Sequence, residues 1–418
     1  MTRRNARRRA DRSVLTYSPR LVYLLQGKGN SSPKMRIWGR EERMKKRVLT
    51  VLLAVLLLVS LFAPTAGAVN YTHFARDLNE LGLFQGVGGG NFELNRAPTR
   101  AEALVMLIRL LGLEEAAHAS AYTHPFADVN GWSEGYIAFA YARGLTRGTS
   151  ETTFEPNAAA TAQMYVTFVL RALGYDDRAG DFAWQDALRF GTEVGVWDPT
   201  LAGGPFLRDQ LAAVSYLALL ARMADSDCRL LETLVTDGVV SAAAAAPILE
   251  RVAHYTQYLS LRDALLRGTV TGGTSVRIVT ASTVVDGVYR QATMEEEMDL
   301  PTDLSAFLEL DALSFAALVL SSEISRSDAG GRTVFTRRLR DAHLAPELRA
   351  IAATLAAEVE EAAIAGTPRG GRLIDRITRT TAGRITAIER TLEFTVPIQI
   401  DNVTMTVEVS WVTALTVG

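Results

Sequence analysis

The sequence predicts a mainly α-helical repeat domain followed by an α+β domain. Two observations carry this fold class: helical segments recur along residues 69–223, and strands of alternating polarity appear toward the end of the chain. A hydrophobic content of 48% with 22% charged residues is typical of globular proteins. At 418 residues, the chain is long enough for two or three domains.

Residues in the first half repeat at an offset of 62 positions. Each copy has the pattern of a helix, a glycine-rich turn, a short loop and a second helix, as expected for duplicated structural units. The matched pairs are Gly82 and Gly144, Leu83 and Leu145, Gly86 and Gly148, Phe92 and Phe154, Thr99 and Thr161, and residues 109–112 with 171–174. A third, more diverged copy begins near Phe182 and has a shorter loop. We therefore expect repeats over 69–113, 122–176 and 181–223.

The second helix of the first copy carries its own start and stop signals. Thr99 is the expected N-cap, and Glu102 follows at the spacing of a capping box. Leu104, Leu107 and Ile108 recur at helical spacing. Gly112 then supplies the stop, because glycine readily adopts the left-handed conformation that ends many helices.

The N-terminal segment has the pattern of an export signal. Residues 44–68 combine a basic start, an apolar run and a small-residue cleavage pattern, which predicts a secretory signal peptide cut after Ala68. A retained membrane helix is the alternative, but the run is shorter than the roughly 20 residues that a bilayer needs. Residues 1–43 form a basic leader, explained by a true start at Met44 or, alternatively, by a nucleic-acid-binding arm.

Charge is distributed unevenly along the chain. Residues 1–47 carry 15 Lys and Arg against 3 Asp and Glu, whereas the rest carries 29 against 43. Nucleic-acid affinity requires clustered positive charge, so we expect no nucleic-acid partner for the mature chain. No later uncharged stretch has spanning length, so we expect no membrane span either. The predicted location is extracellular.

Residues 226–418 are expected to form one α+β domain. Helical spacing covers 225–268, β character follows over 269–290, and a further helix is expected to run from Pro346 to Gly366. The final segments 392–400 and 403–411 alternate in polarity around a turn pair, which predicts a hairpin. Pro397 predicts that the first strand of this hairpin lies at a sheet edge.

No catalytic motif is recognisable, so we expect a non-enzymatic protein without a cofactor or metal. The histidines are scattered at positions 73, 118, 124, 254 and 343, which gives no metal-ligand spacing. Residues 295–297 are consecutive glutamates and are expected to be a solvated charge run. Cys228 is the single cysteine, so no intramolecular disulfide forms. The alternative is an enzyme in which two of the carboxylates of 226–418 meet in the fold and catalyse glycoside hydrolysis.

The repeats resemble the S-layer homology (SLH) family. The residues that carry the resemblance are Phe126-Ala127-Asp128-Val129 with Trp132, then Gly144-Leu145, Phe154-Glu155-Pro156, Leu170-Arg171-Ala172-Leu173-Gly174-Tyr175, and the helix start Thr99-Arg100-Ala101-Glu102. The resemblance covers roughly residues 70–223. It implies three repeats packed as a pseudo-threefold helical bundle. It also implies non-covalent attachment to a secondary cell-wall polysaccharide, often a pyruvylated one, in grooves between repeats.

Five residues are candidate glycan contacts under this resemblance: Arg100, Arg208, Trp132, Asp128 and Glu102. A guanidinium at a helix start can bind a carboxylate in bidentate fashion, and the helix N-terminus is expected to add amide donors. Trp132 offers a flat face for a sugar ring, or alternatively fills the core. Asp128 accepts sugar hydroxyls or caps a helix.

The copies are unequal at these positions. Ala162 stands where the first copy has Arg100, and Met164 stands where it has Glu102. The third copy restores a cation at Arg208.

Three functions compete at this stage. The first is a non-catalytic surface protein that the repeats anchor to the cell wall. The second is a wall-anchored enzyme, such as a glycan hydrolase, with its catalytic unit in 226–418. The third keeps the repeats as an interaction module without glycan affinity.

Overall fold

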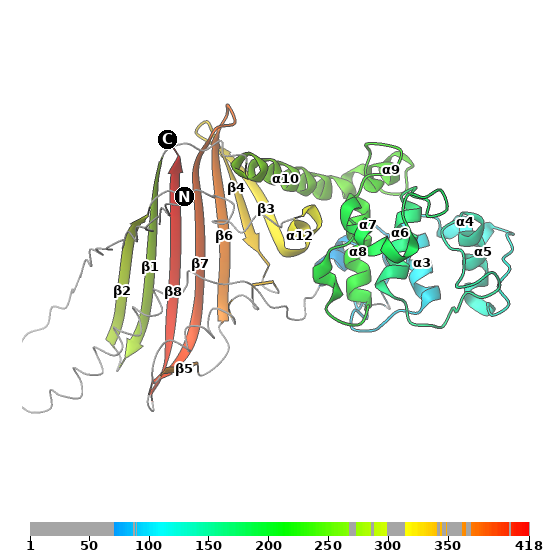
Figure 1. The fold of residues 1–418 in the computed structure, drawn as a ribbon, viewed down its shortest axis with the longest axis horizontal. Coiled ribbons are helices and arrows are strands. Elements are labelled where there is room, and N and C mark those ends of the chain that lie inside the picture. Colours follow the sequence, from blue (N-terminus) through cyan, green and yellow to red (C-terminus); the bar gives the residue numbers. More distant parts are fainter. Residues whose placement is uncertain are drawn as a thin grey trace, which may run out of the picture.

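The computed structural model describes residues 71–417 except positions 87, 89, 267–272, 286–287, 299–313, 341–342, 345–347, 349–361, 365–368 and 401–402. The expected signal peptide at 44–68 and the leader before it lie outside the described residues. Within the described part, a helical region is followed by a large antiparallel sheet, with a long helix between them (Figure 1). This arrangement confirms the expected order of a helical region and an α+β region. No helix of this part is both long and apolar enough to cross a membrane.

The helical region is built from three helix pairs. The pairs are α2 (Thr72–Glu80) with α3 (Arg100–Leu110), α5 (Glu134–Ala142) with α6 (Ala162–Ala172), and α7 (Ala187–Val194) with α8 (Arg208–Leu220). Helix α4 (Glu114–Ala119) and the 3₁₀ turns η1 (Gly131–Ser133), η2 (Trp184–Asp186) and η3 (Pro199–Ala202) lie in the connections. The second helices α3, α6 and α8 each contact the other two, and they supply much of the buried core.

Helix boundaries follow the sequence signals closely. The Thr99 hydroxyl accepts a hydrogen bond from the Glu102 amide, and the Glu102 carboxylate accepts one from the Thr99 amide, so the expected capping box forms. The Thr161 hydroxyl caps α6 in the same way. Gly112 follows α3 with a φ of 66°, in the left-handed region that glycine favours.

The first helix of each pair packs on the second helix of another pair. Helix α5 contacts α3, α7 contacts α6, and α2 contacts α8. The last contact closes the series into a ring, because the first helix of the first pair rests on the second helix of the third pair. Phe74 on α2 and Tyr216 on α8 stack there with ring centroids 4.4 Å apart. Each helix pair therefore depends on its neighbours for its core.

Loops reinforce the ring by capping helices of neighbouring pairs. The amides of Arg100 and Ala101 donate to carbonyls of the second pair's loop, at Ala158 and Pro156. The amides of Arg208 and Asp209 donate in the same pattern to the first pair's loop, at residues 96 and 94. In both loops a glutamate has a positive φ, namely Glu93 at 50° and Glu155 at 61°. A non-glycine residue in this region costs energy, so the surrounding contacts must hold it there.

Helices α9 (Leu230–Thr236), α10 (Ala242–Leu266) and α12 (Phe315–Ser321) connect the ring to the sheet (Figure 1). Helix α9 packs on α8, and α10 lies against strand β3 (Ser322–Ala329). The Tyr255 hydroxyl of α10 donates to the Ser322 carbonyl at 2.9 Å. Arg251 of α10 pairs with Asp77 of α2 at 2.7 Å, so α10 contacts both regions.

Within the described residues, the sheet has eight antiparallel strands. Its order is β2-β1-β8-β7-β6-β4-β3, and β5 pairs with β7. The remaining strands are β1 (Gly273–Val285), β2 (Val288–Met298), β4 (Arg332–Leu339), β5 (Ala362–Ile364), β6 (Arg369–Thr380), β7 (Ile385–Ile400) and β8 (Val403–Val417). Strands β7 and β8 form the expected hairpin, with Ile400 opposite Val403.

A buried charge cluster fixes the register of the central strands. Asp375 on β6 is fully buried and lies opposite Arg337 on β4 and Arg390 on β7. It accepts hydrogen bonds from Arg337 at 3.0 Å and from Arg390 at 2.8 and 3.3 Å. Because side chains alternate between faces, a one-residue slip would carry Asp375 away from both arginines.

Three expectations for the second half were wrong or incomplete. The helix expected to run from Pro346 to Gly366 does not reach its end, because residues 362–364 form β5. Strand β7 is not an edge strand, since β6 and β8 flank it. Pro397 is nevertheless tolerated, because the β6 ladder reaches only Thr395 and the β5 ladder begins at Ile398. Strands β3, β4 and β6, and most of β2, were not expected.

Two histidines are half-buried where α2 meets the residues after β4. Desolvation, reinforced by nearby Arg340, lowers the pKa of His73 to about 3 and that of His343 to about 4. Arg251 and Arg76 lower the pKa of His73 further, while Asp198 raises that of His343. The Nε2 atoms of both rings are buried without a hydrogen-bond partner among the described residues. Both side chains are therefore held neutral at this junction.

This junction predicts acid-sensitive stability. The unfolded chain binds protons at both histidines near pH 6.5, whereas the folded chain binds them only near pH 3–4, so stability falls as the pH drops below about 6.5. Asp209 opposes this trend, because burial raises its pKa to about 6 and its protonation stabilises the folded state. Urea unfolding at pH 7 and pH 5 should show a smaller loss for the His73→Gln, His343→Gln double variant than for the unmodified protein. Equal losses would contradict the burial of neutral histidines.

Candidate functional site

Arg100 reaches from the start of α3 into the second helix pair. Its guanidinium lies 4.8 Å from the ring centroid of Phe154 and 5.3 Å from that of Phe168. Nη2 donates to the Gly148 carbonyl at 3.3 Å, and Nε is buried without a partner among the described residues. No carboxylate among the described residues forms an ion pair with Arg100. The guanidinium thus has unused donors beside two aromatic faces.

Burial changes the electrostatics of Arg100 without removing its charge. Desolvation lowers its pKa to about 10, and Arg171 lowers it further, while Glu155 and Asp128 raise it. A pKa near 10 leaves the guanidinium cationic at neutral pH. A partly desolvated cation attracts an anion more strongly than one in bulk water does.

Asp128 holds the loop on which Arg100 rests. Its two carboxylate oxygens accept the amides of Phe154 at 2.9 Å and Glu155 at 2.7 Å. Desolvation opposes these hydrogen bonds, yet together they lower the pKa of Asp128. The structure therefore brings Asp128 and Arg100 to the same loop, where Asp128 holds the backbone of Phe154 and Glu155.

Gly148 makes the close approach at this loop possible. Its φ is 78°, and an added Cβ would lie 2.4 Å from the Phe126 ring and 2.5 Å from the Thr153 carbonyl. Only glycine fits this position, which explains why both Gly86 and Gly148 recur in the sequence pattern. An added Cβ at Gly86 would likewise lie 2.3 Å from the Asn91 carbonyl.

Glu102 is committed to the protein. One oxygen accepts the Thr99 amide at 2.7 Å, and Arg96 donates to both oxygens at 2.8 and 3.1 Å. Desolvation raises the pKa of Glu102, but the bonds to Arg96 and Thr99 outweigh it and lower the pKa overall. Glu102 therefore lies at the same helix start as Arg100 but orders the loop and cap.

The expected amide donors at the start of α3 are not available, so that expectation was wrong. The amides of residues 99–102 all donate within the protein: to Glu102, Ala158, Pro156 and the Thr99 hydroxyl, respectively. Because the neighbouring loop already occupies this helix end, any ligand must be recognised by side chains.

Arg208 occupies the matching place in the third pair but is buried, with 6% of its surface exposed. Nε donates to the Phe92 carbonyl at 2.8 Å and Nη2 to the Gln85 carbonyl at 3.3 Å, while Nη1 lies 3.3 Å from the Met106 sulfur. The guanidinium also lies 5.5 Å from the Phe84 ring centroid. Arg208 thus joins the third pair to the first through two backbone carbonyls and a methionine sulfur of the first pair.

The second pair has no cation at this position, because Ala162 takes it and Met164 is buried. Gln163 instead donates to the Trp184 carbonyl at 2.8 Å. The three equivalent positions therefore differ in kind: one partly exposed cation, one buried cation and none.

Trp132 lies on η1, and 63% of its surface is exposed. The alternative of a core position for this residue was therefore wrong. Its ring pairs edge-on with Tyr136 at 6.5 Å, whereas Arg100 contacts Phe154, Phe168 and Gly148. Tyr136 in turn bonds to Glu114 and His118, two residues that were not among the sequence candidates. Glu114 and His118 are four residues apart, which places them on one face of a helix and gives a weak sequence signal. Their contact with Tyr136 of α5 can be seen only in the folded structure.

No group of three or more His, Cys, Asp or Glu side chains among the described residues is arranged to hold a metal ion. Residues 295–297 belong to strand β2, and the side chains of Glu295 and Glu297 are exposed. Cys228 is free and exposed.

Parts of the chain are similar to a known domain family and to several bacterial proteins. The S-layer homology domain family matches residues 125–161. A surface layer protein of Brevibacillus choshinensis is 30% identical over 171 residues, covering 38% of this chain and 15% of that protein. A cell surface protein of Thermoanaerobacter kivui is 38% identical over 118 residues, covering 28% and 15%.

An endoglucanase of Bacillus sp. strain KSM-635 is also similar, with 32% identity over 148 residues that cover 31% of this chain and 15% of that enzyme. Each of these matches spans a small part of the relative's own length. The family match covers the Phe126 to Trp132 segment, α5 and the Asp128-bound loop, and it ends at Thr161, the N-cap of α6. The chain is therefore an S-layer homology domain-containing protein.

Proposed function

We propose that this protein is held non-covalently at the bacterial cell wall by its helical ring, which binds an acidic secondary cell-wall polysaccharide. The SLH match and the relatives named as surface-layer, cell-wall and cell-surface proteins support a location at the cell surface or wall. The ring of three helix pairs is the arrangement that we take as the pseudo-threefold bundle of the family.

The observation that carries the glycan proposal is the state of Arg100. It is a cation with unused donors, no carboxylate partner among the described residues, and two aromatic faces that hold it in place. A carboxylate on a sugar, such as a pyruvate ketal, fits this group because guanidinium and carboxylate form paired, charge-assisted hydrogen bonds. The loop carbonyls and amides around it are already bonded, so the side chain supplies the recognition.

Arg208 supports a different role, although it occupies the equivalent position. Its donors are directed to internal carbonyls, and it is almost fully buried. We assign it to holding the first and third pairs together. Of the five sequence candidates, Arg100 is then the residue that contacts the anionic group of the glycan. Asp128 and Glu102 order its surroundings, and Trp132 has no contact with Arg100.

We propose a non-catalytic role for the second half, whose sheet carries a structural charge cluster around Asp375. The match to an endoglucanase is the one observation that favours a wall-anchored glycan hydrolase as the second candidate. Release of reducing sugar from purified wall glycan by residues 226–418 would support that candidate.

Variants of the two arginines test this proposal. Arg100→Ala should weaken binding of purified wall polysaccharide by roughly 10- to 150-fold in calorimetric titration, because a charge-assisted hydrogen bond contributes about 1.5–3 kcal/mol. Arg208→Ala should instead lower the unfolding midpoint, since it leaves the buried Phe92 carbonyl unpaired at a cost of about 1–3 kcal/mol. The exposed Arg178→Ala, which removes the same charge, should change neither. Unchanged affinity in a folded Arg100→Ala variant would contradict the proposed site.

Export is proposed from the signal pattern at 44–68 and from the surface location of the relatives. Protein recovered from the cell envelope should begin near Val69 when sequenced from its N-terminus. A recovered chain that still begins at Met1 or Met44 would contradict cleavage.

A further inference from the structure

A polar network lies beside the exposed ring of Trp132. The Tyr136 hydroxyl donates to Glu114 Oε1 at 2.8 Å and lies 2.8 Å from His118 Nε2. Arg109 donates to the same Glu114 oxygen through Nε at 2.9 Å and Nη2 at 2.7 Å. Three donors therefore converge on one oxygen and fix the carboxylate.

This arrangement leaves two acceptor atoms of the network without a donor among the described residues. With three donors on Oε1, Glu114 Oε2 has no hydrogen bond to any described residue. Since the Tyr136 proton goes to Glu114, its oxygen accepts from His118 Nε2–H, and His118 Nδ1 keeps a free lone pair. His118 is exposed, and the Glu114 side chain is 27% exposed. Two ordered acceptors thus accompany an aromatic face.

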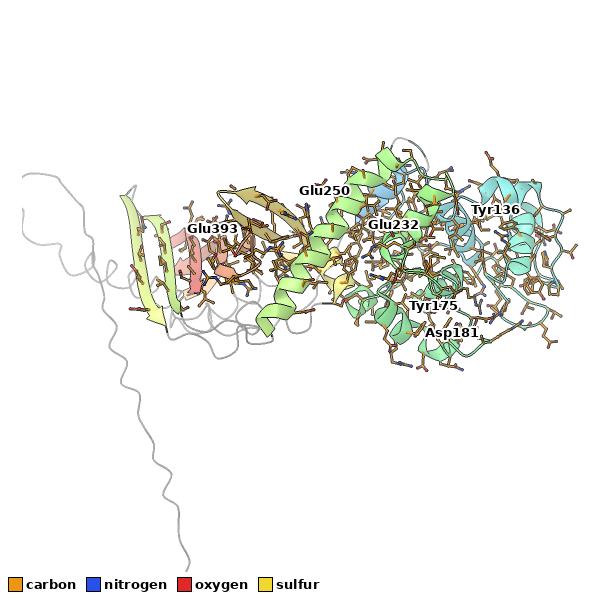
Figure 2. All side chains as sticks on the ribbon, turned by 90° about the horizontal axis from the view of Figure 1, so that it is seen from above. Tyr136, Tyr175, Asp181, Glu232, Glu250 and Glu393 are labelled. Carbon is orange, nitrogen blue, oxygen red and sulfur yellow. The ribbon has the colours of Figure 1, made fainter. Side chains whose placement is uncertain are left out.

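The cluster lies at the end of the ring furthest from the sheet. Figure 2 shows Tyr136 at that end, and α4 and α5 occupy the same end in Figure 1. Helix α4 provides Glu114 and His118, α5 provides Tyr136, and η1 provides Trp132. A ligand bound there would meet the helical ring without approaching the C-terminal region.

We propose that Trp132, Glu114 and His118 form a second saccharide subsite that takes a neutral pyranose ring. The C–H face of such a ring stacks on the indole, and its hydroxyls donate to the Glu114 and His118 acceptors. An anionic sugar is disfavoured, because the only nearby cation in the network, Arg109, is already paired with Glu114. This inference rests on the proposed function and adds to it a contact that does not depend on ligand charge.

Trp184 provides an internal comparison. It lies on η2, the turn that matches η1, and is 52% exposed. The residues at the start of α7 include no tyrosine, so Trp184 has no counterpart of the network that Tyr136 organises. Exposure of a tryptophan alone therefore does not define this subsite.

The experiment compares two forms of purified wall polysaccharide: the native form and a form in which the carboxylates have been reduced to alcohols. Titration of the chain from residue 69 onward should show that Arg100→Ala weakens binding of the native form only. Trp132→Ala should weaken binding of both forms by on the order of tenfold, because stacking is indifferent to charge. Tyr136→Phe, which keeps the ring but releases Glu114 and His118, should give a smaller loss on both. Trp184→Ala should match the unmodified protein.

The outcomes separate this inference from the proposed function. Unchanged binding of both glycans by folded Trp132→Ala would overturn the subsite, while an Arg100→Ala loss on the native form would still support the acidic site. No binding of either form by the unmodified protein would overturn the proposed function itself. A second measurement uses the unmodified protein and so does not depend on whether a variant folds. The NMR resonance of the Trp132 indole N–H should shift when the reduced glycan is added. An unshifted resonance would also count against the subsite.

Discussion

The contact of α2 with α8 is the constraint on which the helical region depends. Each first helix covers the second helix of another pair, so two pairs alone would leave one first helix and one second helix without a cover. Contact between the first helix of the first pair and the second helix of the third pair completes the core, and the stacked rings of Phe74 and Tyr216 lie at that contact. The geometry explains why a lone pair of this sequence type is not expected to be an independent folding unit. Buried apolar area, the main source of stability, comes from between pairs.

The same exchange between pairs creates the candidate sites. The loops that cap α3 and α8 come from neighbouring pairs, and the arginines at the starts of those helices reach into the same loops. Small differences then change function: Arg208 is buried among carbonyls, whereas Arg100 retains unused donors between two rings. One repeat position thus serves cohesion in one place and, as proposed, recognition in another. Ala162 serves neither, so the ring offers unequal surfaces despite its repeated architecture.

Local features were predictable from the sequence because they depend on residues close in the chain. The Thr99–Glu102 capping box, the stop at Gly112 and the β7–β8 hairpin all arise from short-range patterns. The exchange of helices between pairs was not predictable from spacing, since Phe74 and Tyr216 are far apart in the sequence. Arg208 illustrates the limit for the site: its helix-start motif resembles that of Arg100, but its burial depends on Phe84, Phe92 and Gln85 of another pair. Strand β4 was missed because Arg337, which would suggest an exposed position, is buried against Asp375.

The closure of the ring can be measured directly by a double-mutant cycle on Phe74→Leu and Tyr216→Leu in the mature chain. If α2 rests on α8, the two substitutions share one contact, and their effects on the free energy of unfolding should differ from additivity by about 0.5–1.5 kcal/mol, the usual size of an aromatic pair. Effects that add to within about 0.3 kcal/mol would show that the two rings do not meet, and the closed ring would then be wrong.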